Sequence, residues 1–321
     1  MADLTEFELI ARAFMRPVPA GVTGGGDDCA LFEVPTGMRL ATSNDLLLEG
    51  RHFFSDVDPQ ALGHKALAVN LSDLAAMGAR PLACLLGLGL PHIDVPWVDR
   101  FAEGFYALAD RHACPLVGGD TTRSLHDITL SVTVFGFVDP DKVLRRDAAR
   151  AGDDIWVSGQ LGAADVACRM LAGTLPVDAQ VLAQTRMALE RPEPRIALGL
   201  ALAGLAHAAI DVSDGLLQDL GHVLKASGVG AQIDETTLPL HPALAALPET
   251  VARQAALAGG DLYELCFTAD PADAAAVTRA ARAAGALVTR IGRVLVDPGL
   301  RVFDRSGAPL PALPTGFDHF R

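Results

Sequence analysis

The sequence predicts two domains, each built from helices and strands in an α+β or α/β arrangement. The chain has 321 residues, which suggests two domains rather than one. Half of the residues are apolar and 20% are charged, so each domain can bury a substantial core. Segments with helix and strand periodicity alternate in both halves of the chain, and this alternation favours mixed folds.

The first half is expected to contain three helices and three strands. The helix at 60–77 is rich in Ala and Leu and is ended by Gly78 and Pro81. The strand at 128–134 alternates as Ile-Thr-Leu-Ser-Val-Thr-Val, the period of a half-buried strand. The other expected helices are 7–14 and about 97–112, and the other expected strands are 38–42 and 116–117.

A domain boundary is expected in the charged segment 143–152, so we place the domains at 1–145 and 146–321. The second domain is expected to repeat a strand-loop-helix order. The apolar run 196–210 is shorter than the roughly 20 residues of a membrane span, and we interpret it as part of a buried helix. The other expected elements are strands at 155–158, 209–213, 262–268 and 287–294, a helix at 216–227 and an edge strand at 300–303.

Charge and cysteine content narrow the class of protein. The chain has 26 basic and 39 acidic residues, a formal charge of −13, which argues against a nucleic-acid-binding protein. A small phosphorylated ligand is still compatible, because bound metal ions can reverse the local sign. The five cysteines are scattered without a C-x-x-C motif, and no basic-then-apolar leader is evident. We therefore expect a cytoplasmic protein that does not enter a membrane.

Aspartates recur after short apolar strands, beside Gly, Ser or Thr. One such residue alone is well explained by an Asx turn, but the repetition points to a site, because loops at strand ends often hold functional residues. The first example is the stretch TGGGDDCALF, in which three glycines precede two carboxylates. The aspartates of this kind are Asp27, Asp28, Asp45, Asp120, Asp211 and Asp214.

Asp73 differs from these because it lies within an expected helix, KALAVNLSDLAAMG. Helical spacing places it on one face with Asn70, while the neighbouring positions are apolar. A buried carboxylate needs a partner or a cation. The alternative is a polar stripe that faces solvent.

Clustered carboxylates beside glycine-rich turns suggest Mg²⁺, which binds one or two carboxylates together with substrate phosphates. Such a metal would lie between Asp28 and a phosphate that the bare carboxylate would repel. Zinc is disfavoured because no H-x-x-x-H spacing occurs. The P-loop and the G-x-G-x-x-G motif are also absent from the sequence.

Eight segments, taken in order, resemble the thiamine-monophosphate kinase family. They are GGDDCALF, ATSNDLLLEGRHF, HKALAVNLSDLAAMGARP, VGGDTTRS, TLSVTVFGFV, IDVSDGLLQDLGHVLKASG, GGDLYELCFT and GFDHF. The wider superfamily includes aminoimidazole ribonucleotide synthetase and selenophosphate synthetase. The resemblance implies a two-domain PurM-like fold and a homodimer that pairs through a mixed N-terminal sheet. It also implies an N-terminal ATP- and Mg²⁺-binding domain, a C-terminal α/β domain, and ATP-dependent phosphorylation of thiamine monophosphate to thiamine diphosphate.

The resemblance also implies roles for individual residues. Phosphoryl transfer depends mainly on positioning and charge neutralisation, so the group expected to act in catalysis is Asp45, Asp73, Asp120 and Arg146. Arg145 is an alternative to Arg146. The implied ATP contacts are Gly119, Asp120, Arg146 and Ser213, and the implied substrate contacts are His52, Asp261 and Phe317. The implied ligands of several Mg²⁺ ions are Asp28, Ser43, Asn44, Asp45, Asp73, Asp120, Asp211 and Asp214.

Three positions depart from the family pattern, and other functions remain open. Asn44 replaces a hydroxyl residue, Leu262 removes an acidic group, and Pro314 replaces an aromatic residue. One alternative is another ATP-using member of the superfamily, such as an aminoimidazole ribonucleotide synthetase-like enzyme. The others are a metal-dependent phosphohydrolase with a two-metal site and a catalytically silent metal-binding dimer.

Overall fold

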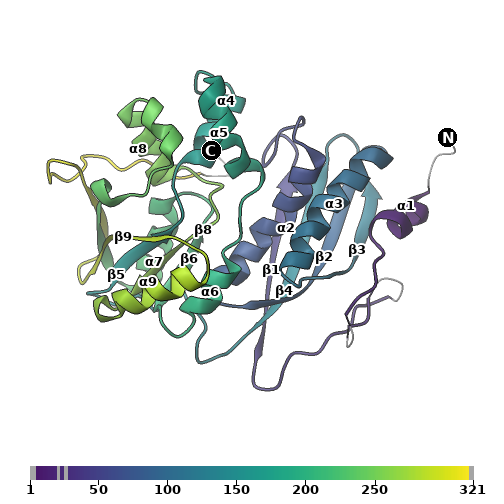
Figure 1. Ribbon diagram of the computed structural model, residues 1–321, viewed down its shortest axis with the longest axis horizontal. Coiled ribbons are helices and arrows are strands. Elements are labelled where there is room, and N and C mark those ends of the chain that lie inside the picture. The colour runs from purple at the N-terminus through teal and green to yellow at the C-terminus, as the bar shows by residue number, and fades with distance from the viewer. Residues whose placement is uncertain (1–4, 20–21, 25–27, 318–321) are drawn as a thin grey trace. The chain divides into compact units, whose positions relative to one another are not determined.

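The computed structural model describes residues 5–19, 22–24 and 28–317, which form two compact units. Unit 1 comprises residues 1–74 and 79–140, and unit 2 comprises residues 75–78 and 141–321 (Figure 1). The chain thus passes into unit 2 after Pro140, five residues before the boundary expected from the sequence. Both units contain helices and a sheet, as the alternation of periodic segments predicts.

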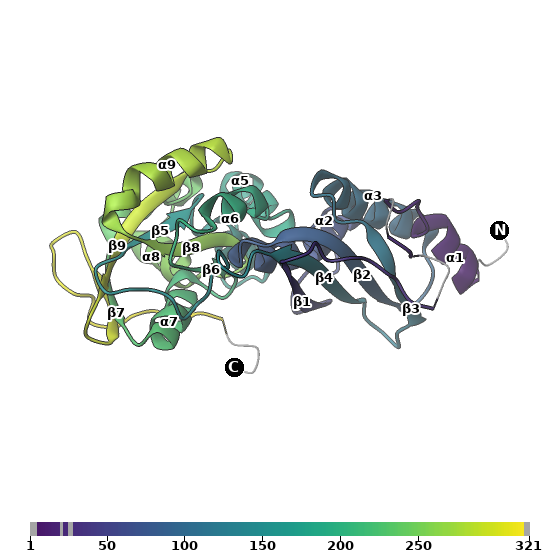
Figure 2. The ribbon, with the colours of Figure 1, turned by 90° about the horizontal axis from the view of Figure 1, so that it is seen from below.

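Unit 1 is a four-stranded sheet whose strand order is β1-β4-β2-β3. Strands β1 and β2 both run antiparallel to β4, and β3 runs parallel to β2. Helices α2 and α3 cover one face of this sheet (Figure 2). The elements are α1 (Glu6–Ala13), β1 (Arg39–Leu48), α2 (Pro59–Ala76), β2 (Arg80–Leu90), α3 (Val95–Arg111), β3 (Leu116–Arg123) and β4 (Thr129–Val138).

The core of unit 1 lies between the two helices and the sheet. Helix α2 is buried on almost every side, and Leu67 and Leu71 are fully buried. Phe101 and Phe105 of α3 are also fully buried. Burial of each such side chain contributes about 1.5–3 kcal/mol, so this layer is a main source of the stability of unit 1.

The two helices approach closely because each has a glycine at the contact. A Cβ atom on Gly63 would lie 2.0 Å from the carbonyl oxygen of Phe101, and one on Gly104 would lie 1.8 Å from that of Gln60. Both contacts are with backbone atoms, which cannot move independently of the helix. Glycine is therefore required at both positions.

The other face of this sheet lies away from α2 and α3 (Figure 2). It carries both polar and apolar side chains. Strand β4 alternates regularly, with Val132 and Val134 buried and Ser131 and Thr133 half-buried. The side chains that share the second face include three exposed leucines of β1: Leu40, Leu46 and Leu48. We call this surface, formed by the outward side chains of β1, β4, β2 and β3, the open face.

Three features of unit 1 differ from the sequence-based expectation. Strand β2 was not expected, because its apolar run follows Gly78 and Pro81 without alternation. Strand β1 continues through Ser43 and Asp45 to Leu48, so these residues lie within a strand and not in the loop after it. Strand β3 likewise continues through Asp120 to Arg123. Hydrogen bonding to neighbouring strands extends these elements beyond their apolar parts.

Unit 2 has a six-stranded sheet whose strand order is β10-β7-β9-β5-β8-β6. Only β10 and β7 pair in parallel, and β10 is an edge strand, as expected. Helix α7 contacts β6, β7, β8 and β10. The strands are β5 (Asp154–Ser158), β6 (Ala208–Val212), β7 (Gly230–Asp234), β8 (Glu264–Ala269), β9 (Val288–Leu295) and β10 (Gly299–Phe303). The helices are α4 (Ala163–Leu171), α5 (Ala179–Glu190), α6 (Ile196–Leu202), α7 (Leu216–Ser227), α8 (Glu249–Ala258) and α9 (Ala274–Ala283), with short 3₁₀ turns at Glu235–Thr237, Pro242–Ala246 and Pro271–Asp273.

The apolar run 196–210 is not a single buried helix. It forms the short helix α6, a turn, and the start of β6. Apart from His207 the run is apolar because most of both elements is buried, and an apolar run does not distinguish a helix from a buried strand. Among the described residues, no helix is long and apolar enough to cross a membrane.

The close approach of α2 and α3 predicts that Gly104→Ala lowers the free energy of unfolding by about 1–3 kcal/mol, because the new methyl group overlaps backbone atoms. The matched control is Gly221→Ala in α7, where a Cβ atom would have no neighbour within 4 Å. This control should raise stability by about 0.4–1 kcal/mol. Urea denaturation of both variants measures the difference, and equal effects would contradict the packing described here.

Candidate functional site

A row of polar side chains joins β1 to α2 within the core layer of unit 1. The hydroxyl of Ser43 donates a hydrogen bond to Oδ2 of Asp73 at 2.5 Å. The backbone N–H of Asp45 donates to Oδ1 of Asn70 at 2.9 Å, and the Asn70 amide donates to the carbonyl oxygen of Ala66. Asn70 is fully buried, and Asp45 and Asp73 are half-buried. The face of α2 that holds Asn70 and Asp73 therefore lies against β1 and not in solvent.

The electrostatics of this cluster favour a cation. Burial and the negative charge of Asp73 raise the pKa of Asp45 to about 6. The two carboxylates therefore repel each other in a position from which water is partly excluded. A bound cation would reduce this repulsion. The donors are carboxylate and hydroxyl oxygens, the ligands that Mg²⁺ prefers.

This cluster supplies only part of a coordination shell. Among the residues that the structure describes, no group of three or more His, Cys, Asp or Glu side chains could hold a metal ion. Mg²⁺ usually keeps several waters and substrate oxygens and needs only one or two carboxylates. The pair Asp45 and Asp73 therefore fits a Mg²⁺ ion that shares its shell with phosphate.

Three other expected ligands, Asn44, Asp120 and Asp28, lie elsewhere in unit 1. The Asn44 side chain lies on the open face, where its amide donates to Ser131 Oγ, the Val132 carbonyl and Thr133 Oγ1 at 2.9–3.0 Å. Asp120 is exposed on β3, at the opposite edge of the sheet from β1. Three strand spacings separate these edges, roughly 14 Å. The structure thus does not bring either residue to the cluster of Asp45 and Asp73.

Asp28 is exposed, and Thr23 and Leu31, which flank it in the sequence, pair through an isolated antiparallel bridge. Phe32 follows Leu31, and its ring centroid lies 5.2 Å from that of Phe135 on the open face. Asp27 lies outside the described residues. The roles of Asp28, Asn44 and Asp120 as metal ligands stay predictions.

Gly119, an expected ATP contact, has a backbone conformation that requires glycine. Its φ is +148°, and a Cβ atom would lie 1.9 Å from the carbonyl oxygen of Leu86 on β2. Only a residue without a side chain lets the two strands meet here. The adjacent Asp120 is therefore held in a fixed place at the edge of the sheet.

His52 lies in the turn that follows β1. Its Nδ1 accepts a hydrogen bond from the backbone N–H of Leu48 at 3.0 Å, so the neutral ring has its proton on Nε2 and can donate from that atom. Lys65 of α2 donates to the carbonyl oxygen of His52 at 3.2 Å. Lys65 is 2% exposed, and sequence reasoning did not select it although it belongs to the quoted segment HKALAVNLSDLAAMGARP.

In unit 2, a buried carboxylate organises the loop after β6. Asp211 lies within β6 and is buried, and Ser213 and Asp214 follow it. One oxygen of Asp219 accepts the backbone N–H groups of Ser213, Asp214 and Gly215 at 3.0–3.1 Å. Burial raises the pKa of Asp219 to about 7, although the three N–H donors act in the opposite direction.

Asp261 and Phe317 lie beside this loop. The N–H of Asp261 donates to the Ser213 carbonyl at 2.8 Å, and the N–H of Phe317 donates to the Asp214 carbonyl at 3.0 Å. Asp261 and Tyr263 have φ values of +59° and +55°, which are unfavourable for residues other than glycine. The Tyr263 hydroxyl donates to Asp261 Oδ1 at 3.2 Å. The structure therefore brings Ser213, Asp214, Asp261 and Phe317 together.

A buried ion pair fixes the start of β8, directly after this strained segment. Glu264 is 7% exposed and receives both Arg195 Nε at 2.7 Å and a second N–H group of that guanidinium. The Ser158 hydroxyl also donates to Glu264, at 2.5 Å. Arg195 and Glu264 were missed by sequence reasoning, because they pair across 69 residues of the chain and Ser158 lies 106 residues from Glu264. Asp219 was also not selected, although its three N–H donors precede it by only four to six residues.

The expected arginine of the site is exposed. Arg145 forms an ion pair with Asp147, whereas no ion pair involves Arg146 in the described part of the chain. The carbonyl oxygen of Arg146 accepts a hydrogen bond from Ser227 at 2.9 Å, which fixes its backbone. The guanidinium of Arg146 therefore has the better opportunity to bind phosphate oxygens.

Comparison with known proteins identifies the family. Residues 26–138 match the AIR synthase related protein N-terminal domain, and residues 150–305 match the C-terminal domain of the same group. The thiamine-monophosphate kinase of Salmonella typhimurium is 43% identical, over 98% of this chain and 98% of that protein.

Solved structures agree with this result. The thiamine-monophosphate kinase of Stenotrophomonas maltophilia is 44% identical, with a TM-score of 0.83 over 92% of this chain and 94% of that one. AaThiL in complex with AMPPCP and TMP is 30% identical, with a TM-score of 0.77 over 90% and 89% of the two chains. The resemblance seen in the sequence motifs and the two-domain mixed fold are thus confirmed, and the chain belongs to the thiamine-monophosphate kinase family.

Proposed function

We propose that this protein transfers the γ-phosphoryl group of ATP to the phosphate of thiamine monophosphate, with Mg²⁺ as the metal. The observation that carries the proposal is the near full-length similarity to thiamine-monophosphate kinases, together with the paired carboxylates of β1 and α2. The AaThiL complex contains an ATP analogue and TMP, which supports both substrates.

The residues assigned to the metal and the phosphates in this proposal include the paired carboxylates of unit 1. Asp45 and Asp73 would hold Mg²⁺, which neutralises charge on the phosphate oxygens. Ser43 orients Asp73 through its hydrogen bond, and Asn70 fixes the backbone of Asp45. Asp28, Asp120 and Asp211 are proposed as ligands of further Mg²⁺ ions, with Asp214 and Asn44. Arg146, Gly119 and Ser213 are proposed to contact ATP.

On the acceptor side, the protein must position the phosphate of thiamine monophosphate, and it has little need to remove a proton from it. A phosphate oxygen is already a competent nucleophile near neutral pH, so no strong general base is needed. We assign His52, Asp261 and Phe317 to the thiamine monophosphate side. Asp261 is suited to this role because the strained backbone around it fixes the direction of its carboxylate.

A homodimer is the proposed assembly, and the open face supports it. Leu40, Leu46 and Leu48 are 49%, 57% and 40% exposed on one face of β1. Soluble proteins rarely leave such grouped apolar side chains uncovered, and a second copy of the same sheet would cover them.

If the protein transfers the γ-phosphoryl group, incubation with ATP, Mg²⁺ and thiamine monophosphate should yield thiamine diphosphate and ADP in equal amounts. Chromatography of the products together with a phosphate-release assay measures this. Release of inorganic phosphate without a phosphorylated acceptor would instead indicate a phosphohydrolase. If neither inorganic phosphate nor thiamine diphosphate is formed, the result would favour a catalytically silent metal-binding protein.

The role of Asp73 predicts that Asp73→Ala lowers kcat by about 10²–10³-fold without unfolding the protein, because Ala suits a helix and electrostatic stabilisation is lost. Asp127→Ala, a change of an exposed aspartate in the same unit, is the matched control and should keep normal activity. Near-normal kcat of the Asp73 variant at saturating Mg²⁺ would rule out its metal role.

We assign His52 to the acceptor and Asp45 to the metal, and this assignment predicts different kinetic effects for His52→Ala and Asp45→Ala. The first should raise KM for thiamine monophosphate more than KM for ATP, because we place His52 on the acceptor. The second should impair both ATP binding and turnover. Initial rates with each substrate varied in turn provide the measurement. A selective loss of ATP affinity in His52→Ala would reverse the assignment.

The dimer proposal predicts that Leu46→Lys shifts the protein toward monomer, because a charge would enter the covered face. Leu125→Lys is the matched control, since Leu125 is 90% exposed in a loop of the same unit. Sedimentation velocity distinguishes the two states. A dimer of unchanged stability in the Leu46 variant would place the interface elsewhere.

A further inference from the structure

The C-terminal segment of unit 2 returns to the loop that follows β6. Residues 311–317 belong to no helix or strand, yet they include Phe317, which we assign to the acceptor side of the site. Within the described residues, the backbone of 310–317 forms hydrogen bonds with backbone groups of other segments only at its two ends. The position of Phe317 therefore depends on how these two ends are held.

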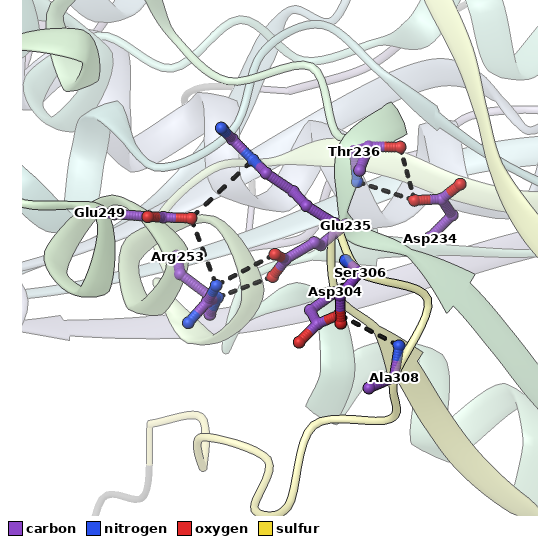
Figure 3. Close-up of polar contacts among 9 residues, drawn as sticks. Asp234, Glu235, Thr236, Glu249, Arg253, Asp304, Ser306 and Ala308 are labelled. Atoms are coloured by element: carbon purple, nitrogen blue, oxygen red, sulfur yellow. Dashed lines mark hydrogen bonds and ion pairs between the residues drawn. The ribbon is translucent and has the colours of Figure 1, made fainter.

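The first end is fixed by a turn after β10. Oδ1 of Asp304 accepts the N–H and the hydroxyl of Ser306 and the N–H of Ala308, at 2.6–3.1 Å (Figure 3). The N–H of Asp304 also donates to the carbonyl oxygen of Ala308 at 2.9 Å. Beyond this turn, the N–H of Leu310 donates to the carbonyl oxygen of Val302 at 2.8 Å. The turn therefore fixes where the C-terminal segment begins.

The backbone of Phe317, at the second end, is held on both sides. Its N–H donates to the carbonyl oxygen of Asp214 at 3.0 Å, and its carbonyl oxygen accepts a hydrogen bond from Nε2 of Gln218 at 2.9 Å. The same nitrogen of Gln218 donates to Oδ2 of Asp214 at 3.3 Å. Both partners are acceptors, which establishes the orientation of the Gln218 amide. Gln218 lies in the first turn of α7, so the helix holds this amide beside the loop.

A glycine allows the segment to approach the loop this closely. A Cβ atom on Gly316 would lie 2.5 Å from the carbonyl oxygen of Asp214 and 2.7 Å from Oε1 of Gln218. The carbonyl oxygen cannot move without the loop, which Asp219 holds through three backbone N–H groups. Glycine is therefore required at position 316 for Phe317 to reach the loop.

The two acceptor-side residues that meet this loop differ in their support. Asp261 comes shortly before β8, and its N–H donates to the carbonyl oxygen of Ser213 at 2.8 Å. The buried ion pair of Glu264 fixes the start of that strand. Phe317 lies in a segment without helix or strand, so its position depends more on the hydrogen bond from Gln218.

We propose that Gln218 is a positioning residue for the acceptor, an inference that rests on the proposed function. By holding the carbonyl group of Phe317, Gln218 fixes the attachment point of an aromatic side chain that is 40% exposed. A ring that is already in place loses less entropy when the aromatic rings of thiamine monophosphate bind. Because Gln218 acts through Phe317, its loss should weaken acceptor binding and leave the transfer step unchanged.

The test is a double-mutant cycle with Gln218→Met, Phe317→Ala and the double variant. Methionine keeps the length of the side chain and suits a helix, but it has no donor. Gln218→Met should raise KM for thiamine monophosphate about three- to tenfold, with kcat and KM for ATP unchanged. In the Phe317→Ala background the same change should have little further effect. Gln184→Met, at an exposed glutamine of α5, is the matched control and should have normal kinetics.

Hydrogen exchange provides a readout that does not require catalysis. Gln218→Met should speed the exchange of the Phe317 amide in the free protein, measured by mass spectrometry of peptides that contain it, and Gln184→Met should not. Gly316→Ala keeps Gln218 but places a methyl group against the Asp214 carbonyl. This variant should therefore speed the same exchange and also raise KM for thiamine monophosphate. Unchanged exchange in Gln218→Met would overturn the proposal.

The kinetic outcomes separate this proposal from the proposed function. Absence of thiamine diphosphate with the unchanged protein would overturn both. If the unchanged protein forms thiamine diphosphate, equal KM values for Gln218→Met and Gln184→Met would overturn only the role of Gln218. Additive effects of Gln218→Met and Phe317→Ala, or a selective rise in KM for ATP, would show that Gln218 acts on another group. Either result would also overturn the proposal.

Discussion

The contact of β1 with α2 is the constraint on which unit 1 depends. The same face of α2 both fills the apolar core and holds the carboxylate of Asp73 beside that of Asp45 on β1. It does so because Ser43 and Asn70 satisfy polar groups that burial would otherwise leave without partners. Asp45 and Asp73 remain crowded, and the raised pKa of Asp45 reflects this. The fold thus tolerates local electrostatic strain at the pair of carboxylates that we propose to bind a cation.

Unit 2 uses buried ionic groups in a different way. Asp219 gathers three backbone N–H groups, and Glu264 is held by Arg195 and Ser158. Both carboxylates accept their hydrogen bonds from groups of the protein itself. Together they fix the loop after β6 and the segment before β8, so that Asp261 can keep an unfavourable backbone conformation. Rigid support of this kind is what precise positioning of a phosphate acceptor requires.

The sequence by itself determined the mixed two-domain architecture, the helices α1, α2, α3 and α7, and the identity of the family. Helix α7 was predicted at its observed bounds, since its amphipathic pattern and the following Gly228 are local signals. The aspartates, the Asp73 helix and the glycine-rich turns were also evident, because motif residues are contiguous. Strand β2 and the length of β1 were not, since hydrogen bonds to strands distant in sequence decide where a strand ends.

Only the tertiary structure decided which of these residues meet. It joined Ser43 to Asp73 and Asp45 to Asn70, and it placed Asn44 on the opposite face because side chains alternate along a strand. It also revealed Lys65 and Glu264, whose partners His52 and Arg195 lie 13 and 69 residues away in the sequence. A sequence specifies which chemical groups are present, but their environment depends on packing between segments that are far apart in the chain.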